Sequence, residues 1–198
     1  MSQGKVLIIY DTNSGNAYRM AKIIGRGVDS IESGTAVIRA VPKVGERSSE
    51  RLPPVPAEGA PYIQVGELAD CDALIIGGPT HFGNMSASLK YFLDQTTEHW
   101  IKGSLSGKPA GVFTSTGSMH GGQEATLLSM MIPLLHHGML ICGIPYSNPD
   151  LMQTQRGGTP YGASHVSGEQ GDTPISDAES RLCKALGARV ASVALKLK

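Results

Sequence analysis

The sequence lacks the cysteine pairs, the excess of charge and the long apolar stretches that define several large protein classes. Its three cysteines, Cys71, Cys142 and Cys183, lie far apart and never form a C-x-x-C pair, so we expect neither a disulfide framework nor a metal site. The 17 Lys and Arg residues equal the 17 Asp and Glu residues, and this zero net charge argues against nucleic-acid binding. No apolar stretch approaches the roughly 20 residues of a membrane span. The apolar run at residues 6–10 is too short for a signal peptide, so we expect a cytoplasmic protein.

Glycine, in contrast, is abundant, with 25 residues in a chain of 198. Because these glycines are neither periodic nor confined to a tail, they indicate tight turns or close backbone approaches. Apolar residues make up 40% of the chain, which is enough for a sizeable core. We therefore expect residues 1–198 to form a single domain.

Short apolar runs alternate with helical patterns along the chain. The patterns predict strands and, between them, helices; Pro133 within the third helix predicts a kink or an early end. Three of the runs are apolar at consecutive positions, as in strands covered on both faces. This alternation predicts a flavodoxin-like, doubly wound α/β fold with a five-stranded parallel sheet of order 2-1-3-4-5 and helices on both faces. The predicted strands are 6–10, 35–41, 73–77, 111–114 and 139–144, and the predicted helices 17–31, 85–93, 123–137 and 177–196.

Two segments do not fit a minimal version of this fold. Residues 42–66 hold five of the twelve prolines and indicate a long loop, with a short helix as one option before the third strand. Residues 147–176 are polar, rich in glycine and interrupted by proline. Irregular stretches of this length in a compact domain are usually functional or mobile.

Three polar, glycine-containing loops follow predicted strands, at residues 12–17, 79–84 and 115–122. Ligands of open α/β sheets bind beyond the carboxyl ends of the strands, where these loops meet. The first loop offers hydroxyls, amides and helix N-terminal N–H groups, which suit a phosphate, although it could equally be an ordinary helix cap. It matches neither the P-loop nor the G-x-G-x-x-G pattern. The other two loops are placed to sandwich a flat ring. A phosphate joined to a flat heteroaromatic ring predicts FMN as the ligand.

A phosphate-accepting receiver domain is the competing interpretation of this arrangement. It needs clustered acidic residues after the first strand and an Asp at the end of the third. Here Asp11 stands alone and the third strand ends in Gly-Gly-Pro, so the receiver interpretation fails.

Four segments carry a more specific resemblance: GGPTHFGNMSASLKYFLDQT (77–96), FTSTGSMHGGQEATLLSMM (113–131), LLHHGM (134–139) and RGGTPYGASHVSG (156–168). In this order they resemble the WrbA family of flavodoxin-like NAD(P)H:quinone oxidoreductases over essentially the whole chain. The resemblance implies an FMN-dependent enzyme that transfers two electrons from NAD(P)H to quinones by a ping-pong hydride mechanism. It also implies a homotetramer with active sites near subunit junctions, and places residues 147–176 near the flavin or a subunit interface.

The resemblance also assigns roles to residues. His136 matches a histidine near the flavin and is the expected catalytic residue, while Trp100 and Phe82 are expected to bind substrate. The expected cofactor-binding residues are Thr12, Asn13, Ser14, Gly15, Asn16, Ala17, Pro79, Thr80, His81, Phe82, Gly83, Ser115, Thr116, Gly117, Ser118, Met119, Gly121 and His136.

The sequence departs from the family pattern at positions that concern the electron donor. Ser14 stands where relatives carry a Tyr implicated in nicotinamide binding, and His81 replaces a usual Arg. The third loop is one residue longer, with Met119 and His120 in place of a plain glycine step.

Two other functions remain as alternatives. One is a flavodoxin-type electron carrier without NAD(P)H turnover, which the zero net charge disfavours. The other is an interaction protein of the tryptophan repressor, but the sequence offers no basic face for it.

Overall fold

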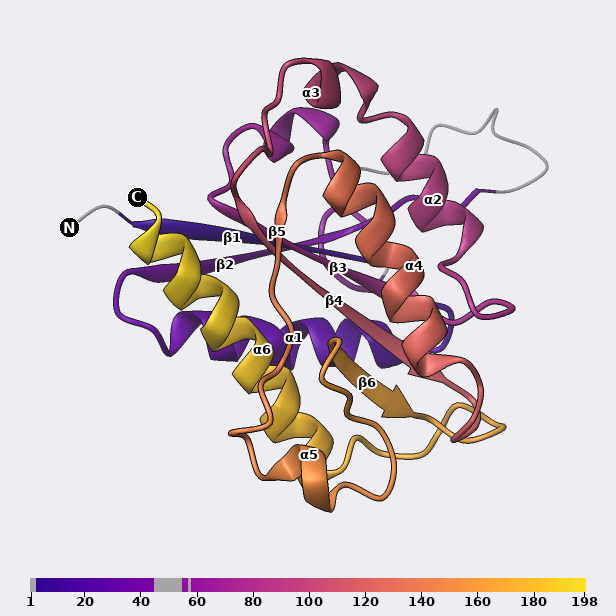
Figure 1. Ribbon diagram of the computed structural model, residues 1–198. Coiled ribbons are helices and arrows are strands. Elements are labelled where there is room, and N and C mark those ends of the chain that lie inside the picture. Colours follow the sequence, from indigo (N-terminus) through magenta and orange to yellow (C-terminus); the bar gives the residue numbers. More distant parts are fainter. Residues whose placement is uncertain (1–2, 45–54, 57) are drawn as a thin grey trace.

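The computed structural model describes residues 3–44, 55–56 and 58–198 as a twisted parallel sheet between two layers of helices (Figure 1). The strands β1 (Gly4–Tyr10), β2 (Gly34–Ala40), β3 (Ala73–Pro79) and β4 (Pro109–Thr116) pair in the order β2-β1-β3-β4, with β5 (Leu140–Ile141) next to β4. The predicted order 2-1-3-4-5 is confirmed. All of these pairings are parallel, so the carboxyl ends of the strands share one edge.

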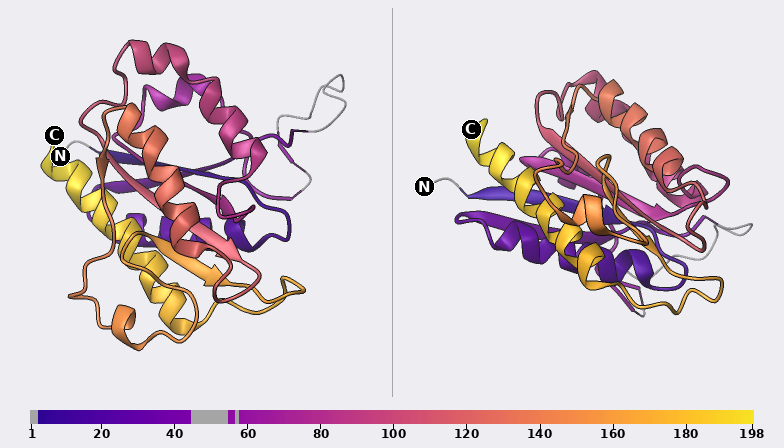
Figure 2. Two further views of the ribbon diagram at one scale, coloured as in Figure 1. Left: turned by 45° about the vertical axis from the view of Figure 1, so that its right-hand side comes forward. Right: turned by 60° about the horizontal axis from the view of Figure 1, so that its bottom comes forward.

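The consecutive apolar residues of the central strands pack against both helical layers. In β1, Ile8 packs toward α1 (Asn16–Asp29) and α6 (Asp177–Lys196), whereas its neighbours Leu7 and Ile9 pack toward α2 (Ala87–Asp94) and α4 (Gln123–His136). Because successive side chains of a strand point to opposite faces, a strand buried on both sides must be apolar at every position. Figure 2 shows the resulting layers, with α1 and α6 together on one face.

The helices begin and end close to where the sequence predicts them. Ser86 caps α2 by accepting a hydrogen bond from the backbone N–H of Leu89 (3.3 Å). The helix α4 runs through Pro133 and ends three residues later, so the proline lies in its last turn. Two short helices, α3 (Thr97–Ile101) and α5 (Asp150–Gln153), are not predicted, and a 3₁₀ helix at Val65–Leu68 supplies the short helix before β3.

The predicted fifth strand is wrong in its extent. Only Leu140–Ile141 of the predicted residues 139–144 forms β5, which pairs with the start of β4. The far half of β4 pairs instead with β6 (Ala163–Val166), which the sequence analysis does not predict. The fifth position of the sheet is thus shared by two short strands, separated in sequence by residues 142–162.

The chain leaves β4 at Gly143 because another segment crosses there. The backbone N–H of Ile144 donates to the carbonyl oxygen of Pro160 (2.9 Å), and the same carbonyl occupies the space that a side chain at Gly143 would need. Only glycine permits this close approach, after which the chain turns away from the sheet.

Residues 45–54 and 57, which belong to the predicted loop at 42–66, lie outside the described residues. In the described part of the chain, no helix has both the length and the apolar character needed to cross a membrane.

Candidate active site

The first site loop, called loop 1 (residues 11–15), connects β1 to α1 at the carboxyl edge of the sheet. It ends at Gly15, whose φ of 82° is in the left-handed region and which caps α1 without a side-chain hydrogen bond. The first N–H groups of an α-helix have no acceptor within the helix. Without a side-chain cap, these donors and the positive end of the helix dipole are available to an anion.

The side chain of Asn16 is already engaged, contrary to its simplest role as an anion donor. Its Nδ2 donates to Ser14 Oγ (3.1 Å) and to the carbonyl oxygen of Gly171 (2.8 Å), while its Oδ1 accepts from Arg19 (2.6 Å). Asn16 is also buried. Its amide therefore holds loop 1 against a distant turn, and only its backbone N–H is left for a ligand.

A cation adjoins loop 1 although the loop itself contains no Lys or Arg. Lys43, just beyond β2, donates from Nζ to Asp11 Oδ1 (2.6 Å) and to Asn13 Oδ1 (2.6 Å). Asp11 is buried at the end of β1, and its Oδ1 also accepts from the Thr12 N–H (2.8 Å). Lys43 thus compensates the only carboxylate in the loop, and sequence reasoning missed it because it lies 30 residues away.

The second site loop, called loop 2 (residues 80–86), is anchored by hydroxyl groups. Thr80 Oγ1 lies 3.1 Å from both Thr114 Oγ1 of β4 and Thr126 Oγ1 of α4. Beyond it, His81 and Asn84 exchange backbone hydrogen bonds of 2.8 and 3.0 Å around a tight turn. At the tip of that turn Phe82 is fully exposed and has a φ of 52°, which is strained for a bulky residue.

The third predicted loop begins later than expected, because β4 extends through Thr116. Loop 3 is therefore residues 117–122. The carbonyl oxygen of Ser115 accepts from Thr80 N (3.0 Å), and that of Thr116 accepts from both the backbone N–H (2.8 Å) and Oγ (3.0 Å) of Ser167. Ser167 opens a further segment, called loop 4 (residues 167–173), that closes over the carboxyl edge of the sheet.

These segments enclose a cavity of about 190 Å³. Of the predicted cofactor-binding residues, Gly15, Phe82, Gly83, Ser118, Met119, Gly121 and His136 do not line it, while Ser167 does and was missed. Its polarity comes from neutral hydroxyl and amide groups. The lining is Thr12, Asn13, Ser14, Asn16, Ala17, Pro79, Thr80, His81, Ser115, Thr116, Gly117 and Ser167.

A wider cavity of about 930 Å³ runs between α2, α3 and α4. His81 lines both cavities, and Phe82, Trp100 and His136 line the wider one. However, α4 starts next to loop 3 and its 14 residues span about 20 Å, so His136 lies at the far end of the helix (Figure 1). Within one chain, His136 and Trp100 thus line the wider cavity with residues of loop 2, but they do not line the smaller cavity that loops 1 and 3 share.

His137, which the sequence analysis did not single out, also lines the wider cavity. Its Nε2 lies 2.9 Å from the buried Thr96 Oγ1. Burial, together with the nearby His99 and His136, lowers the pKa of His137. A neutral, hydrogen-bonded imidazole therefore adjoins the exposed His136.

Comparisons with known proteins show the family to which the chain belongs. A family model described as NADPH-dependent FMN reductase matches residues 5–148. Two curated relatives named NAD(P)H dehydrogenase (quinone), from Geotalea daltonii and Syntrophobacter fumaroxidans, are 42% and 43% identical, each over 98% of both chains. The chain belongs to the NADPH-dependent FMN reductase family. The family resemblance predicted from the four sequence segments is confirmed.

Solved structures of other proteins show the same fold. The flavodoxin, WrbA-like protein from Agrobacterium tumefaciens superimposes with a TM-score of 0.71 at 24% identity, over 99% of this chain and 100% of that chain. A flavodoxin from the domain Archaea gives a TM-score of 0.64 at 18% identity, over 96% and 99%. Loops 1 to 3 of this family member thus lie on a flavodoxin-like sheet.

A buried carboxylate fixes the segment that carries β6 and loop 4. Glu179 Oε1 accepts from the backbone N–H groups of Gly157 and Val166 (3.0 Å each), and lies 3.1 Å from His165 Nδ1. Its Oε2 accepts from Ser176 N (2.7 Å). Burial alone would raise the pKa of Glu179, but the hydrogen bonds from these groups outweigh it and hold the pKa at about 2.

We predict that Glu179→Gln lowers the free energy of unfolding by about 2–4 kcal/mol at pH 7, because a neutral amide accepts fewer of these hydrogen bonds. Since the pKa of the carboxyl is lowered by folding, its contribution is complete above about pH 4.5 and declines as the pH falls toward 2. Denaturant unfolding of both proteins between pH 7 and pH 3 should show the difference shrinking with acidity.

Glu32→Gln is the matched control, since Glu32 is exposed in the turn after α1. It should leave stability unchanged at every pH. An unfolding free energy of Glu179→Gln equal to that of the unmodified protein at pH 7 would contradict a structural role for the carboxylate.

Proposed function

We propose that this protein is an FMN-dependent NAD(P)H dehydrogenase that reduces quinones, with residues 1–198 working as one domain. The curated relatives that carry this name are about 42% identical over nearly the whole chain. One observation carries the proposal: α1 starts without a side-chain cap, at the edge of a cavity lined by neutral hydroxyls and amides. This is the donor set that a phosphate ester needs.

The residues of the smaller cavity fit the phosphate end of FMN. Thr12 and Ser14 offer hydroxyl groups, and the first turn of α1 offers backbone N–H groups. Thr80, Ser115 and Gly117 also line this cavity, and His81 joins it to the wider cavity. FMN, when bound, supplies the two-electron redox chemistry between NAD(P)H and a quinone. The protein binds and orients the reactants and excludes water from them.

The wider cavity suits the two substrates in turn. Phe82 and Trp100 offer apolar surfaces to a flat quinone or nicotinamide ring. His136, which is exposed there, orients the quinone or donates a proton to its reduced oxygen. A single cavity used by both substrates requires the first product to leave before the second substrate binds.

We propose further that the protein assembles with copies of itself, as a homotetramer, so that His136 and Trp100 of one copy also approach the smaller cavity of another. Large, exposed apolar side chains on α3 and α4, the helices beside the wider cavity, support this assembly. Ile132 and Leu135 of α4 are exposed by 59% and 58%, and Trp100 by 52%. Exposed apolar residues gathered on one face are typical of protein interfaces.

Thr12→Val tests the phosphate site. We expect it to raise the Kd for FMN about 10-fold, because a hydrogen bond to a charged oxygen contributes about 1.5 kcal/mol or more. The affinity for riboflavin, which has no phosphate, should not change. Quenching of flavin fluorescence measures both constants. Thr35→Val in β2, outside both cavities, is the control and should bind FMN normally. Equal losses for FMN and riboflavin would show that Thr12 does not contact the phosphate.

Steady-state kinetics test the shared cavity. With the FMN-loaded protein, plots of reciprocal rate against reciprocal NAD(P)H concentration at several fixed quinone concentrations should give parallel lines. Intersecting lines would mean that both substrates bind together. Negligible NAD(P)H oxidation, with a stable one-electron reduced flavin, would instead support an electron carrier.

Complementation tests the assembly. Thr12→Asp places a carboxylate in the phosphate site and His136→Ala removes the imidazole, so each variant alone should lose most quinone reduction. When the two variants are refolded together, sites that combine an intact Thr12 with an intact His136 form, and activity should return. A monomer in sedimentation experiments that retains full activity would refute the shared site.

A further inference from the structure

Asn13 of loop 1 lies between two cavities. It lines the smaller cavity of the candidate active site, and it also lines a separate cavity of about 540 Å³, which we call the outer cavity. Asp11 and Lys43 line the outer cavity but not the smaller one, whereas His81 lines the smaller cavity but not the outer one. The Asn13 side chain thus stands between the proposed phosphate site and a pair of opposite charges.

The contacts of Asn13 fix the direction in which its amide points. Lys43 Nζ lies 2.6 Å from Asn13 Oδ1. An ammonium group has hydrogens to donate and no lone pair with which to accept, so the amide atom that it contacts must be the oxygen. The amide nitrogen points away from Lys43 and toward loop 2, where it lies 3.5 Å from His81 Nε2. Asn13 therefore presents its NH2 group, and not its oxygen, on the side of the smaller cavity.

The direction of this amide decides whether Asn13 attracts or repels a phosphate. An amide NH2 group donates to phosphate oxygens, whereas an amide oxygen has only lone pairs to offer them. In the part of the chain that the structure describes, the lining of the smaller cavity includes no Lys or Arg, so the binding depends on neutral donors. An inverted amide would place an acceptor against the phosphate, with no cation in the lining to offset it.

Lys43 is itself held in place by a buried carboxylate. Its Nζ lies 2.6 Å from Asp11 Oδ1, and the Asp11 side chain is only 2% exposed. The same oxygen accepts from the backbone N–H of Thr12 (2.8 Å), which ties the carboxylate to loop 1. Because a buried carboxylate is costly without a cation beside it, Lys43 stays at this position, and its remaining hydrogens reach Asn13.

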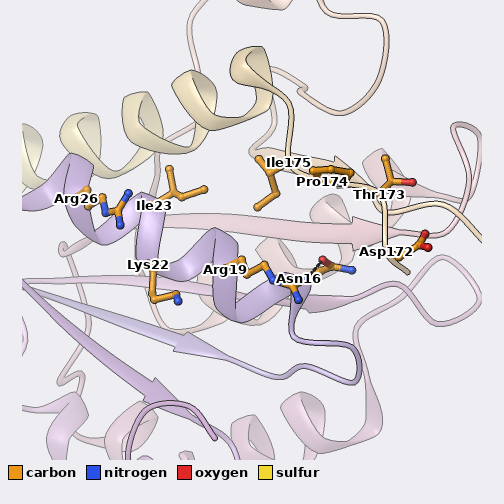
Figure 3. A pocket seen from close by; sticks show the side chains of 9 residues that line it. All are labelled: Asn16, Arg19, Lys22, Ile23, Arg26, Asp172, Thr173, Pro174 and Ile175. Atoms are coloured by element: carbon orange, nitrogen blue, oxygen red, sulfur yellow. Dashed lines mark hydrogen bonds between the residues drawn. The ribbon is translucent and has the colours of Figure 1, made fainter. Parts of the chain in front are cut away.

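Arg19, another cation close to loop 1, does not replace Lys43 in this role. Its Nη1 donates to Asn16 Oδ1 (2.6 Å), and Figure 3 shows these two side chains joined beside α1. Arg19 lines the outer cavity and a further cavity of about 490 Å³ between α1 and residues 172–175, but not the smaller cavity. The cation that contacts the Asn13 amide is therefore Lys43.

We infer that Lys43 is a positioning residue for FMN: it holds the Asn13 amide with its nitrogen toward the smaller cavity, where this nitrogen donates to the phosphate. The inference rests on the proposed function, because it concerns the cofactor of that site. It goes further by assigning to a lysine beyond the end of β2 a part of the selectivity for a flavin that carries a phosphate. Riboflavin has no phosphate for Asn13 to bind, so Lys43 does not affect its affinity.

Lys43→Met tests the inference, since methionine has a similar length and no charge. We expect the Kd for FMN to rise at least 10-fold, which is the effect of losing one charge-assisted hydrogen bond of about 1.4 kcal/mol. The Kd for riboflavin should stay within twofold of that of the unmodified protein, which also shows that the variant is folded. Quenching of flavin fluorescence measures both constants.

Two further variants serve as controls. Lys43→Arg keeps a cation whose several N–H groups can donate to both oxygens, so its Kd for FMN should stay within threefold. Lys102→Met removes a lysine that also pairs with a carboxylate, that of Glu98, but lies outside these cavities. It should change neither constant.

A double-mutant cycle separates positioning from charge compensation. In the Asn13→Ala background there is no amide to orient, so Lys43→Met should weaken FMN binding by about threefold or less. Compensation of Asp11 alone would give the same fold loss in both backgrounds, and that result would overturn the inference. Equal losses for FMN and riboflavin in Lys43→Met would contradict it too, since they indicate a general disturbance of loop 1. Failure of the unmodified protein to bind FMN would overturn the proposed function instead.

Discussion

The site depends on hydrogen-bond donors that the chain leaves without an acceptor. α1 and α4 both begin at a glycine of positive φ, Gly15 and Gly122, and neither has a side-chain cap. By contrast, α2 and α6 begin at Ser86 and Ser176, whose hydroxyls accept a hydrogen bond from the first turn. Side chains thus satisfy the starts of α2 and α6 but not those of α1 and α4, which adjoin loops 1 and 3; the short helices α3 and α5 also begin without a side-chain cap. A buried or half-buried N–H group without a partner is costly, and a phosphate removes that cost.

The surroundings of these donors are rigid. The Asn16 amide joins loop 1 to loop 4, Lys43 neutralises Asp11, and Thr80 joins loop 2 to β4 and α4 through neighbouring hydroxyls. Each contact links segments that are far apart in the sequence. The site loops are thus held in place before a ligand arrives, which reduces the entropy lost on binding.

Much of the fold follows from the sequence because its signals are local. Consecutive apolar residues indicate strands buried on both faces, and the α6 boundaries follow from helical periodicity. The split of the fifth strand depends on a carbonyl of Pro160 that meets Gly143, a contact that no local pattern contains. The same holds for Lys43 and Ser167, which reach the site from 30 or more residues away, and for the buried Glu179 and His165. The position of His136 could not be predicted either, because a resemblance identifies a residue without giving its distance from the site loops.

The split strand also affects how the sheet meets other molecules. The edge of the sheet next to β4 consists of the two-residue strand β5 and the four-residue strand β6, which pair with different parts of β4. Extended edges with unpaired backbone groups are templates for unwanted strand pairing. Here no uninterrupted row of such groups is long enough to accept a further strand. On this side the protein is protected from edge-to-edge aggregation.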